Sequence, residues 1–405
     1  MAESSSSIAL GLALGLTSAT QLRAPFLPVG PGEVLLAMWL CAALVSLARQ
    51  RQFETNPLVK PFLVFWLLTL AALALGWCSG LYLNVWDNAS TRDAFAVLLA
   101  AGVVMVSSVQ RRAAQRLWLA SGALSVTLVV GLGVLLALST MGRPVLGPIN
   151  SLYGFRFAGW ALNPNQTALA VSVVPFFAIE RRNACEGRVS RLGWTVVALV
   201  ALVVGIATLS DALMLGWGVA AAIIGGKWWA LTTFVPGNSR SAKRIAIFAV
   251  PLVVVGAIIA AGPRIIQLSE ATAESSYQSN GQGADRVARW KHGLDAAARA
   301  PVFGLGPGSY SGPFSSFQGE EAHNTPIDWL DSTGVVGLLA LLGLWSWVAW
   351  RVASMKRKGA GIALSALLSF AMFHFVLRQP VFWFLLLALA ASPPTIFHAS
   401  RRVGG

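Results

Sequence analysis

Long apolar blocks separated by short polar segments dominate this chain of 405 residues. The blocks are about 17–23 residues long, which is the length that an α-helix needs to cross a hydrocarbon core of about 30 Å. Only 11% of the residues are charged, whereas soluble domains carry about 25%. This pattern excludes a soluble cytoplasmic enzyme and predicts an all-α, polytopic integral membrane protein.

Twelve blocks are predicted as transmembrane helices, with approximate bounds at 7–22, 31–48, 60–79, 92–109, 117–139, 164–180, 193–209, 211–229, 244–262, 333–350, 359–377 and 381–397. The chain then divides into three parts. Nine helices occupy residues 1–262, a long loop with short helices occupies residues 263–325, and three helices with a C-terminal tail occupy residues 326–405.

The basic residues define the expected orientation of these helices. Of the 30 Lys and Arg residues, 20 fall in one alternating set of short loops, which the positive-inside rule places in the cytoplasm. Both termini are then cytoplasmic and the long loop is external. The net charge of +14 therefore reflects membrane insertion, and we find no basic stripe with interleaved aromatic residues that would indicate nucleic-acid binding.

Ten cations lie on the predicted external side against this bias, and nine of them are Arg: Arg23, Arg92, Arg143, Arg156, Arg264, Arg286, Arg289, Lys291, Arg299 and Arg378. The planar guanidinium fork suits bidentate contacts with phosphate. Several of these residues lie near predicted membrane ends, where an anionic lipid headgroup would be located. The alternative is that they are ordinary loop residues or partners of the external acids.

The long loop contains a predicted helix over 285–299. Its apolar residues recur at helical spacing and form one stripe: Val287, Trp290, Leu294 and Ala298. Arg286 and Arg289 lie three residues apart at one edge of this stripe. A helix packed on the membrane domain would hold both guanidinium groups at the seam, and Pro301 ends the helix.

His323 lies where the chain re-enters the membrane, in the segment Glu-Glu-Ala-His-Asn at residues 320–324. Histidine is the usual general base because its ordinary pKa is close to neutral pH. Nearby Arg charges would disfavour the imidazolium and leave His323 able to accept a proton. The alternative is a polar cap at a helix start. The segment lacks the ligand spacing of a metal site, and we expect neither a metal nor another cofactor.

These motifs together resemble the O-antigen ligase/polymerase superfamily. The matching elements are Arg286 four residues before Trp290, the P-x-x-G-x-G turn at 301–306, the His-Asn pair at 323–324 and the G-x-x-G helix start at 334–337. An upstream match combines Arg156-Phe-Ala-Gly with Asn-Pro-Asn at 163–165. The resemblance covers roughly residues 150–345. Many members carry Ser-Arg-Gly at a central external hairpin, where this chain has Asp211 in place of the Arg.

The resemblance implies a metal-independent glycosyltransferase at the periplasmic face of a Gram-negative inner membrane. The donor would be a glycan on undecaprenyl pyrophosphate, and the acceptor would be a sugar hydroxyl of the lipid A–core of lipopolysaccharide. His323 would be the essential base, and Arg286, together with Arg289 and Arg156, would bind the pyrophosphate. Arg143 or Arg378 would replace the missing family Arg. Asn324 and Asp328 are further candidates for substrate contacts.

Three activities share these motifs: O-antigen ligase, O-antigen polymerase and protein O-oligosaccharyltransferase. We favour the ligase because the chain shows no large soluble C-terminal segment and only one large external loop; this is an association at family level. A membrane transporter is the alternative from a different class. It would need charged residues in the middle of its spans, and the predicted spans contain almost none there.

Overall fold

The computed structural model describes residues 2–23, 29–49, 56–85, 88–142, 149–234, 279–308, 320–355, 357–376 and 378–391. The elements in chain order are α1 (Ala2–Leu16), η1 (Thr20–Leu22), α2 (Pro31–Ala48), α3 (Val59–Tyr82), α4 (Asn88–Val109), α5 (Ala113–Thr140), β1 (Leu152–Tyr153), β2 (Arg156–Phe157), α6 (Pro164–Val171), α7 (Val174–Ala184), α8 (Arg188–Ala207), α9 (Asp211–Phe234), α11 (Ser279–Ala297), α12 (Thr325–Ser354), α13 (Lys358–Ala371) and α14 (Pro380–Ala390).

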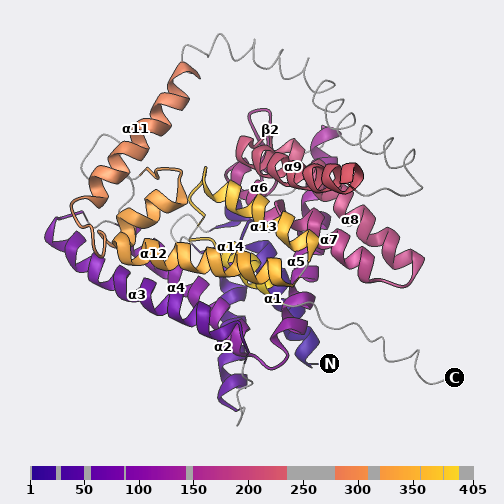
Figure 1. The fold of residues 1–405 in the computed structure, drawn as a ribbon, viewed down its shortest axis with the longest axis horizontal. Helices are drawn as coiled ribbons and strands as arrows, with labels where there is room; N and C mark the ends of the chain where they lie inside the picture. Colours follow the sequence, from indigo (N-terminus) through magenta and orange to yellow (C-terminus); the bar gives the residue numbers. More distant parts are fainter. Residues whose placement is uncertain are drawn as a thin grey trace.

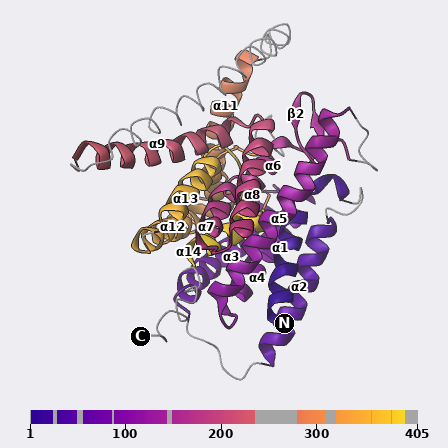
Figure 2. The same ribbon diagram turned by 90° about the vertical axis from the view of Figure 1, so that its right-hand side faces the viewer.

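The helices pack into one body, from which α11 projects (Figures 1 and 2). Within the described residues, six helices are long and apolar enough to cross a membrane: α2, α3, α4, α5, α8 and α12. The predicted class of an all-α membrane protein is confirmed at this level, with one addition, because β1 and β2 form a small antiparallel hairpin. The predicted ninth span at 244–262 lies outside the described residues.

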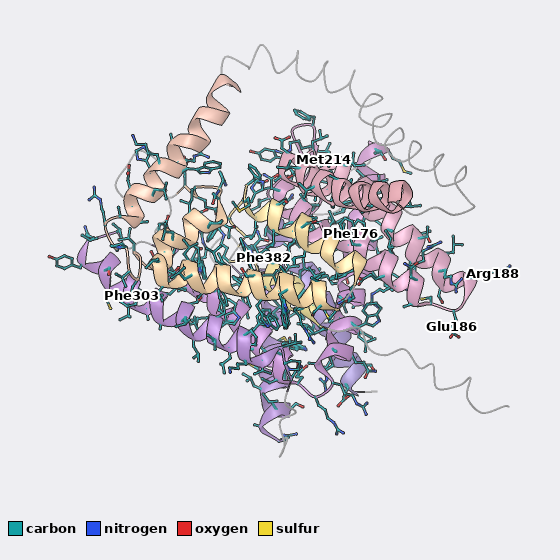
Figure 3. The ribbon with its side chains drawn as sticks, in the orientation of Figure 1. Phe176, Glu186, Arg188, Met214, Phe303 and Phe382 are labelled. Atoms are coloured by element: carbon teal, nitrogen blue, oxygen red, sulfur yellow. The ribbon has the colours of Figure 1, made fainter. Side chains whose placement is uncertain are left out.

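Helix α14 lies at the centre of the molecule and packs against α4, α5 and α12 (Figure 1). All of its 11 residues are buried, and its sequence is apolar on every face, which is the pattern of a core helix. An apolar helix of this length is too short to span a bilayer alone. The prediction placed a longer span at 381–397. Phe382 of this helix lies in the interior, whereas Glu186 and Arg188 lie at the edge (Figure 3).

The predicted span at 164–180 is broken into two helices. Helix α6 ends at Val171, and α7 begins at Val174 with Pro175 in its first turn. Proline has no backbone N–H and cannot continue the hydrogen-bond ladder of a helix. Because of this break, α6 is a short, separate helix. Its first turn lines the cavity that is described below.

The P-x-x-G-x-G turn at 301–306 fills a second break, in the middle of α12. This helix loses its regular geometry at Gly334, whose φ of 62° lies in the left-handed region. The amide of Leu305 donates a hydrogen bond to the carbonyl of Asp331 at 2.7 Å, and the amide of Val335 donates back to the turn at 2.8 Å. The turn therefore satisfies the backbone groups that the break exposes.

Helix α3 packs against the other side of this turn. A Cβ atom at Gly76 would collide with the carbonyl oxygen of Phe303, and one at Gly80 would collide with that of Leu305. The glycines of α3 thus let two backbones touch. The turn and α3 together fix the first part of α12, and His323 lies in the loop that leads into this helix.

Candidate active site

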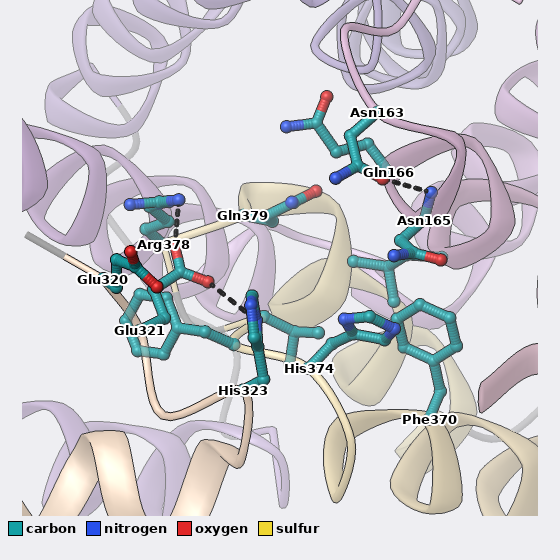
Figure 4. A pocket seen from close by; sticks show the side chains of 13 residues that line it. Asn163, Asn165, Gln166, Glu320, Glu321, His323, Phe370, His374, Arg378 and Gln379 are labelled. Carbon is teal, nitrogen blue, oxygen red and sulfur yellow. Dashed lines mark hydrogen bonds and ion pairs between the residues drawn. The ribbon is translucent and has the colours of Figure 1, made fainter. Parts of the chain in front are cut away.

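A cavity of about 290 Å³ opens where α6, the loop before α12 and the connection between α13 and α14 meet (Figure 4). Its lining is mostly polar, with Asn163, Asn165, Gln166, Glu320, Glu321, His323, His374, Arg378 and Gln379, and its apolar part consists of Leu169, Phe370, Phe375 and Val376. Segments more than 150 residues apart in the sequence therefore share one polar site.

His323 lines the cavity with a strained backbone. Its φ of 54° lies in the left-handed region, which costs about 1–3 kcal/mol for a residue with a side chain. The buried carboxylate of Asp328 compensates by accepting hydrogen bonds from the amides of Ala322 at 2.7 Å and of Asn324 at 3.2 Å. These two amides flank His323, so Asp328 clamps the loop on both sides of the imidazole.

Asn324 and Asp328 do not line the cavity. Asn324 caps α12 by accepting a hydrogen bond from the amide of Ile327, and it donates to the carbonyl of Met372. Both residues are buried behind His323. The sequence proposed them as substrate contacts; in the structure their side chains bind backbone groups around His323 and at Met372.

Arg378 lies beside His323 in the same cavity and is held by two carboxylates. It pairs with Asp93 of α4 at 3.4 Å and with Glu321. The second oxygen of Glu321 lies 3.7 Å from Nδ1 of His323 (Figure 4). Burial raises the pKa of Glu321, and the positive charge of Arg378 opposes this rise. The three side chains therefore form one coupled charged group.

His374 also lines this cavity, with its ring centroid 6.0 Å from that of His323. The sequence analysis placed it inside a predicted span at 359–377. The structure ends α13 at Ala371 and puts His374 in the connection to α14. Polar residues interrupting an apolar run were the available signal, with His374 followed by Arg378 and Gln379.

Arg156 does not line the cavity but holds one of its walls. From β2, its Nε donates to the carbonyl of Thr208 at 3.0 Å, and a terminal nitrogen donates to the side-chain oxygen of Asn165 at 3.0 Å. Burial lowers the pKa of Arg156, and the charge of Asp211 opposes this shift. Arg156 thus reaches the α8–α9 hairpin where many superfamily members carry an Arg.

Three amides on α6 form the wall opposite the charged group. The side-chain oxygen of Asn163 accepts from the amide of Asn165, that of Asn165 accepts from Arg156, and that of Gln166 accepts from Thr20 at 2.6 Å. A guanidinium and a backbone amide can only donate, so these two partners fix the oxygen atoms of Asn163 and Asn165. Figure 4 shows the side-chain nitrogen of Asn165 facing the cavity.

The remaining predicted arginines lie at the edge of the site or outside the described part. Arg289 of α11 pairs with Glu320 at 2.6 Å, and Glu320 lines the cavity. Arg286 lies within α11, but its side chain is not described, and Arg143 lies outside the described residues. The structure therefore brings Arg378 next to His323. Arg289 does not line the cavity but pairs with Glu320, which does.

The chemistry available in this cavity is proton transfer, anion binding and hydrogen bonding. An imidazole, a guanidinium and three amide donors face the same space. Among the described residues, no group of three or more His, Cys, Asp or Glu side chains is arranged to hold a metal ion. A site of this kind suits a substrate that combines a negatively charged group with hydroxyl groups.

The fold and the cavity define a multi-helix membrane protein with a polar site built around a histidine and arginines. Residues 190–342 match the family model described as O-antigen ligase. The match confirms the resemblance to the O-antigen ligase superfamily that the sequence motifs predict. His323 and α11 lie inside the matched segment, whereas Arg156, His374 and Arg378 lie outside it. No curated protein matches the chain.

Proposed function

We propose that this protein is an O-antigen ligase. In this reaction a glycan is transferred from undecaprenyl pyrophosphate to a sugar hydroxyl of the lipid A–core. The family supports a glycosyltransferase-like membrane enzyme in general. The observation that carries the finer proposal is the position of His323, which faces the cavity from a strained backbone beside Arg378.

His323 acts as the general base in this proposal. Its imidazole removes the proton from the acceptor hydroxyl, and the hydroxyl oxygen attacks the anomeric carbon of the donor sugar. The bond between that carbon and the pyrophosphate oxygen breaks, and the polyprenyl pyrophosphate leaves with the electron pair. The imidazolium then releases its proton to water. The donor is already activated, so no nucleotide is required.

Arginines stabilise the charge that develops on the leaving pyrophosphate. Arg378 is the first candidate because it lines the cavity, and we assign to it the role of the family Arg missing at Asp211. Arg289 is the second candidate, because it pairs with Glu320, which lines the cavity. Arg286 of the same helix is the third candidate. Arg156 contributes indirectly, by holding the amide of Asn165 in the cavity wall.

The wall of amides would bind oxygen atoms of the sugar substrates. Its three side-chain amides line the same cavity as His323 and Arg378. Neutral donors of this kind hold sugar oxygens by directional hydrogen bonds. The proposal thus separates an anion side from a sugar side, with the base between them.

The proposed setting is the inner membrane, with the twelve-span arrangement, both termini in the cytoplasm and the cavity on the periplasmic side. Two features support it. The basic residues gather in one set of loops, and the polyprenyl tail of the donor can stay in lipid only if the site lies at the bilayer surface. The loop over 263–325 would then be periplasmic.

The test uses cells deleted for their own O-antigen ligase. We would express the wild type, His323→Ala and the matched control His292→Ala, which changes a histidine of α11 that does not line the cavity. The lipopolysaccharide is resolved on a gel. We expect a ladder of capped lipopolysaccharide with the wild type and the control, and at least about a 10²-fold loss with His323→Ala.

Two results would contradict this proposal. A normal ladder from well-expressed His323→Ala would show that His323 is not the general base. No ladder from well-expressed wild type, with a compatible donor and core, would exclude the ligase. The same extract would then be examined for lengthened lipid-linked glycan, which indicates a polymerase, and for glycosylated protein.

A further inference from the structure

Glu321 lies between the two central side chains of the cavity. One of its carboxylate oxygens pairs with Arg378, and the other lies 3.7 Å from Nδ1 of His323. The second distance is longer than a hydrogen bond. Glu321 is therefore bound to the guanidinium and only close to the imidazole.

Arg378 has a reason to release Glu321 when an anion enters. Two carboxylates, Asp93 and Glu321, share its one positive charge, and its side chain is 30% exposed where it lines the cavity. A pyrophosphate would compete for the donors of the guanidinium. It would also repel the nearby carboxylate of Glu321. The imidazole of His323 lies within reach of that carboxylate, with its Nδ1 at 3.7 Å.

We propose that Glu321 is a positioning residue shared by Arg378 and His323, and that it moves from the guanidinium to Nδ1–H of His323 when the donor pyrophosphate binds. Glu321 stays ionised and takes no proton. Its hydrogen bond fixes the imidazole tautomer that carries the proton on Nδ1, which leaves Nε2 to take the proton of the acceptor hydroxyl. Donor binding would thereby activate the base. This inference rests on the proposed function.

Other charged groups surround this pair and stay in place in the proposed step. They come from the same loop, from α4, from α12 and from the α13–α14 connection: Glu320, Arg92, Asp93, Asp328, Arg378 and His374. Asp93 matters most, because it keeps one partner on Arg378 while Glu321 moves. The loop itself stays anchored by the hydrogen bonds that Asp328 accepts.

The test compares Glu321→Gln with Glu321→Asp and with the matched control Glu33→Gln. Glu33 pairs with Arg23 and does not line the cavity. The full-length proteins are purified in detergent, and transfer is measured with undecaprenyl-pyrophosphate-linked glycan and rough lipopolysaccharide from the ligase-deleted cells. For Glu321→Gln we expect kcat to fall about 10- to 100-fold, with the KM for the donor unchanged or lowered, because a negative charge next to the pyrophosphate is removed.

The pH profile distinguishes positioning from a general structural defect. An ionised carboxylate beside an imidazole favours the imidazolium. Its removal keeps His323 neutral at lower pH, so the acid limb of the kcat profile should move to lower pH in Glu321→Gln. A structural defect would lower kcat at every pH without moving this limb. Glu321→Asp keeps the charge, so it should retain the limb of the wild type, with a smaller loss of kcat.

Each outcome separates this inference from the proposed function. Wild-type kcat and an unmoved acid limb in Glu321→Gln would overturn the positioning role, whatever His323→Ala shows. A raised donor KM with normal kcat would also overturn it, because Glu321 would then only shape the donor site. If Glu321→Gln does not fold, Glu321→Asp decides: a lowered kcat with an unmoved acid limb supports the role, and wild-type kcat or a moved limb overturns it. Activity that survives His323→Ala contradicts the proposed function itself.

Discussion

Arg378 and Arg357 lie at opposite ends of α14 and differ in what surrounds them. Arg357 donates to the carbonyls of Leu389 and Ala391 at the end of α14 and pairs with Glu180 at 2.5 Å. Arg378 precedes the start of α14 and pairs with two carboxylates, and it lines the cavity of about 290 Å³. The space beside Arg357 holds only about 10 Å³, which is at the lower limit for one water molecule.

The difference shows how one residue type serves two purposes in one helix bundle. One terminal nitrogen of Arg357 donates to two backbone carbonyls, which are fixed acceptors and complement a cation at a helix C-terminus, and the other pairs with Glu180. The ion-pair partners of Arg378 are side chains, which can move, and a cavity lies in front of it. Arg357 thus ties elements of the fold together, whereas Arg378 borders open space.

The largest expected effect is that of Arg378→Lys. Lysine keeps the charge but loses the planar fork that holds two anions at once. We expect transfer to fall about 10²-fold, equal to about 2.7 kcal/mol of transition-state stabilisation, with little change in melting temperature. Transfer by purified protein and a thermal melt in detergent measure the two. A variant with a lower melting temperature and normal transfer would show that Arg378 stabilises the fold and not the reaction.

The matched change at the other end, Arg357→Lys, should have the opposite profile. It removes hydrogen bonds from a cation to the carbonyls of Leu389 and Ala391. We expect the free energy of unfolding to fall by about 2 kcal/mol, with kcat of the folded fraction near that of the wild type. Denaturant titration in detergent gives the first value. A specific loss of kcat at full stability would remove the contrast between the two arginines.

A smaller effect is expected for Arg156→Lys, which tests how far the site extends. A single ammonium cannot reach both the carbonyl of Thr208 and the side chain of Asn165 with the geometry of the guanidinium. We expect about a tenfold rise in the KM for a sugar substrate, because the amide of Asn165 loses its fixed orientation. An unchanged KM for both substrates would show that the wall of amides needs no support from Arg156.

The smallest effect is expected for Glu3→Gln, which provides a baseline for pairs that are neither buried nor next to the cavity. Glu3 pairs with Arg116 at 3.1 Å, and its side chain is 51% exposed. Exposed pairs of this kind contribute about 0.5 kcal/mol or less. Stability and transfer should both match those of the wild type. A stability loss as large as that of Arg357→Lys would show that the exposure of an ion pair does not decide how much it stabilises this protein.

Much of the fold follows from local sequence, and the exceptions have local causes too. Apolar length predicted the helices because each must bury or hide its backbone in lipid. Pro175 broke the predicted span at 164–180, and Gly334 broke α12. The length of α14 was overestimated because an apolar run looks the same whether lipid or protein surrounds it.

The candidate site was predictable in part. The type and position of His323 in the chain were sufficient to select it as the candidate base. The sequence could not choose among the external arginines, because their distances from His323 depend on which helix ends meet. His374 and Glu321 were missed as neighbours of the base for the same reason. Asn324 and Asp328 were selected by their nearness in sequence, and both face away from the cavity.

The sequence by itself thus determined a helical membrane protein and predicted a histidine and arginines on one side of it, because apolar length and charge bias act along the chain. Tertiary structure alone decided that Glu321 lies between Arg378 and His323 and that Arg156 donates to Asn165. The physical reason is that a sequence pattern describes only the local segment in which it occurs. Helical periodicity records which face of a helix is apolar, whereas a cavity depends on helix ends brought together by packing from distant parts of the chain.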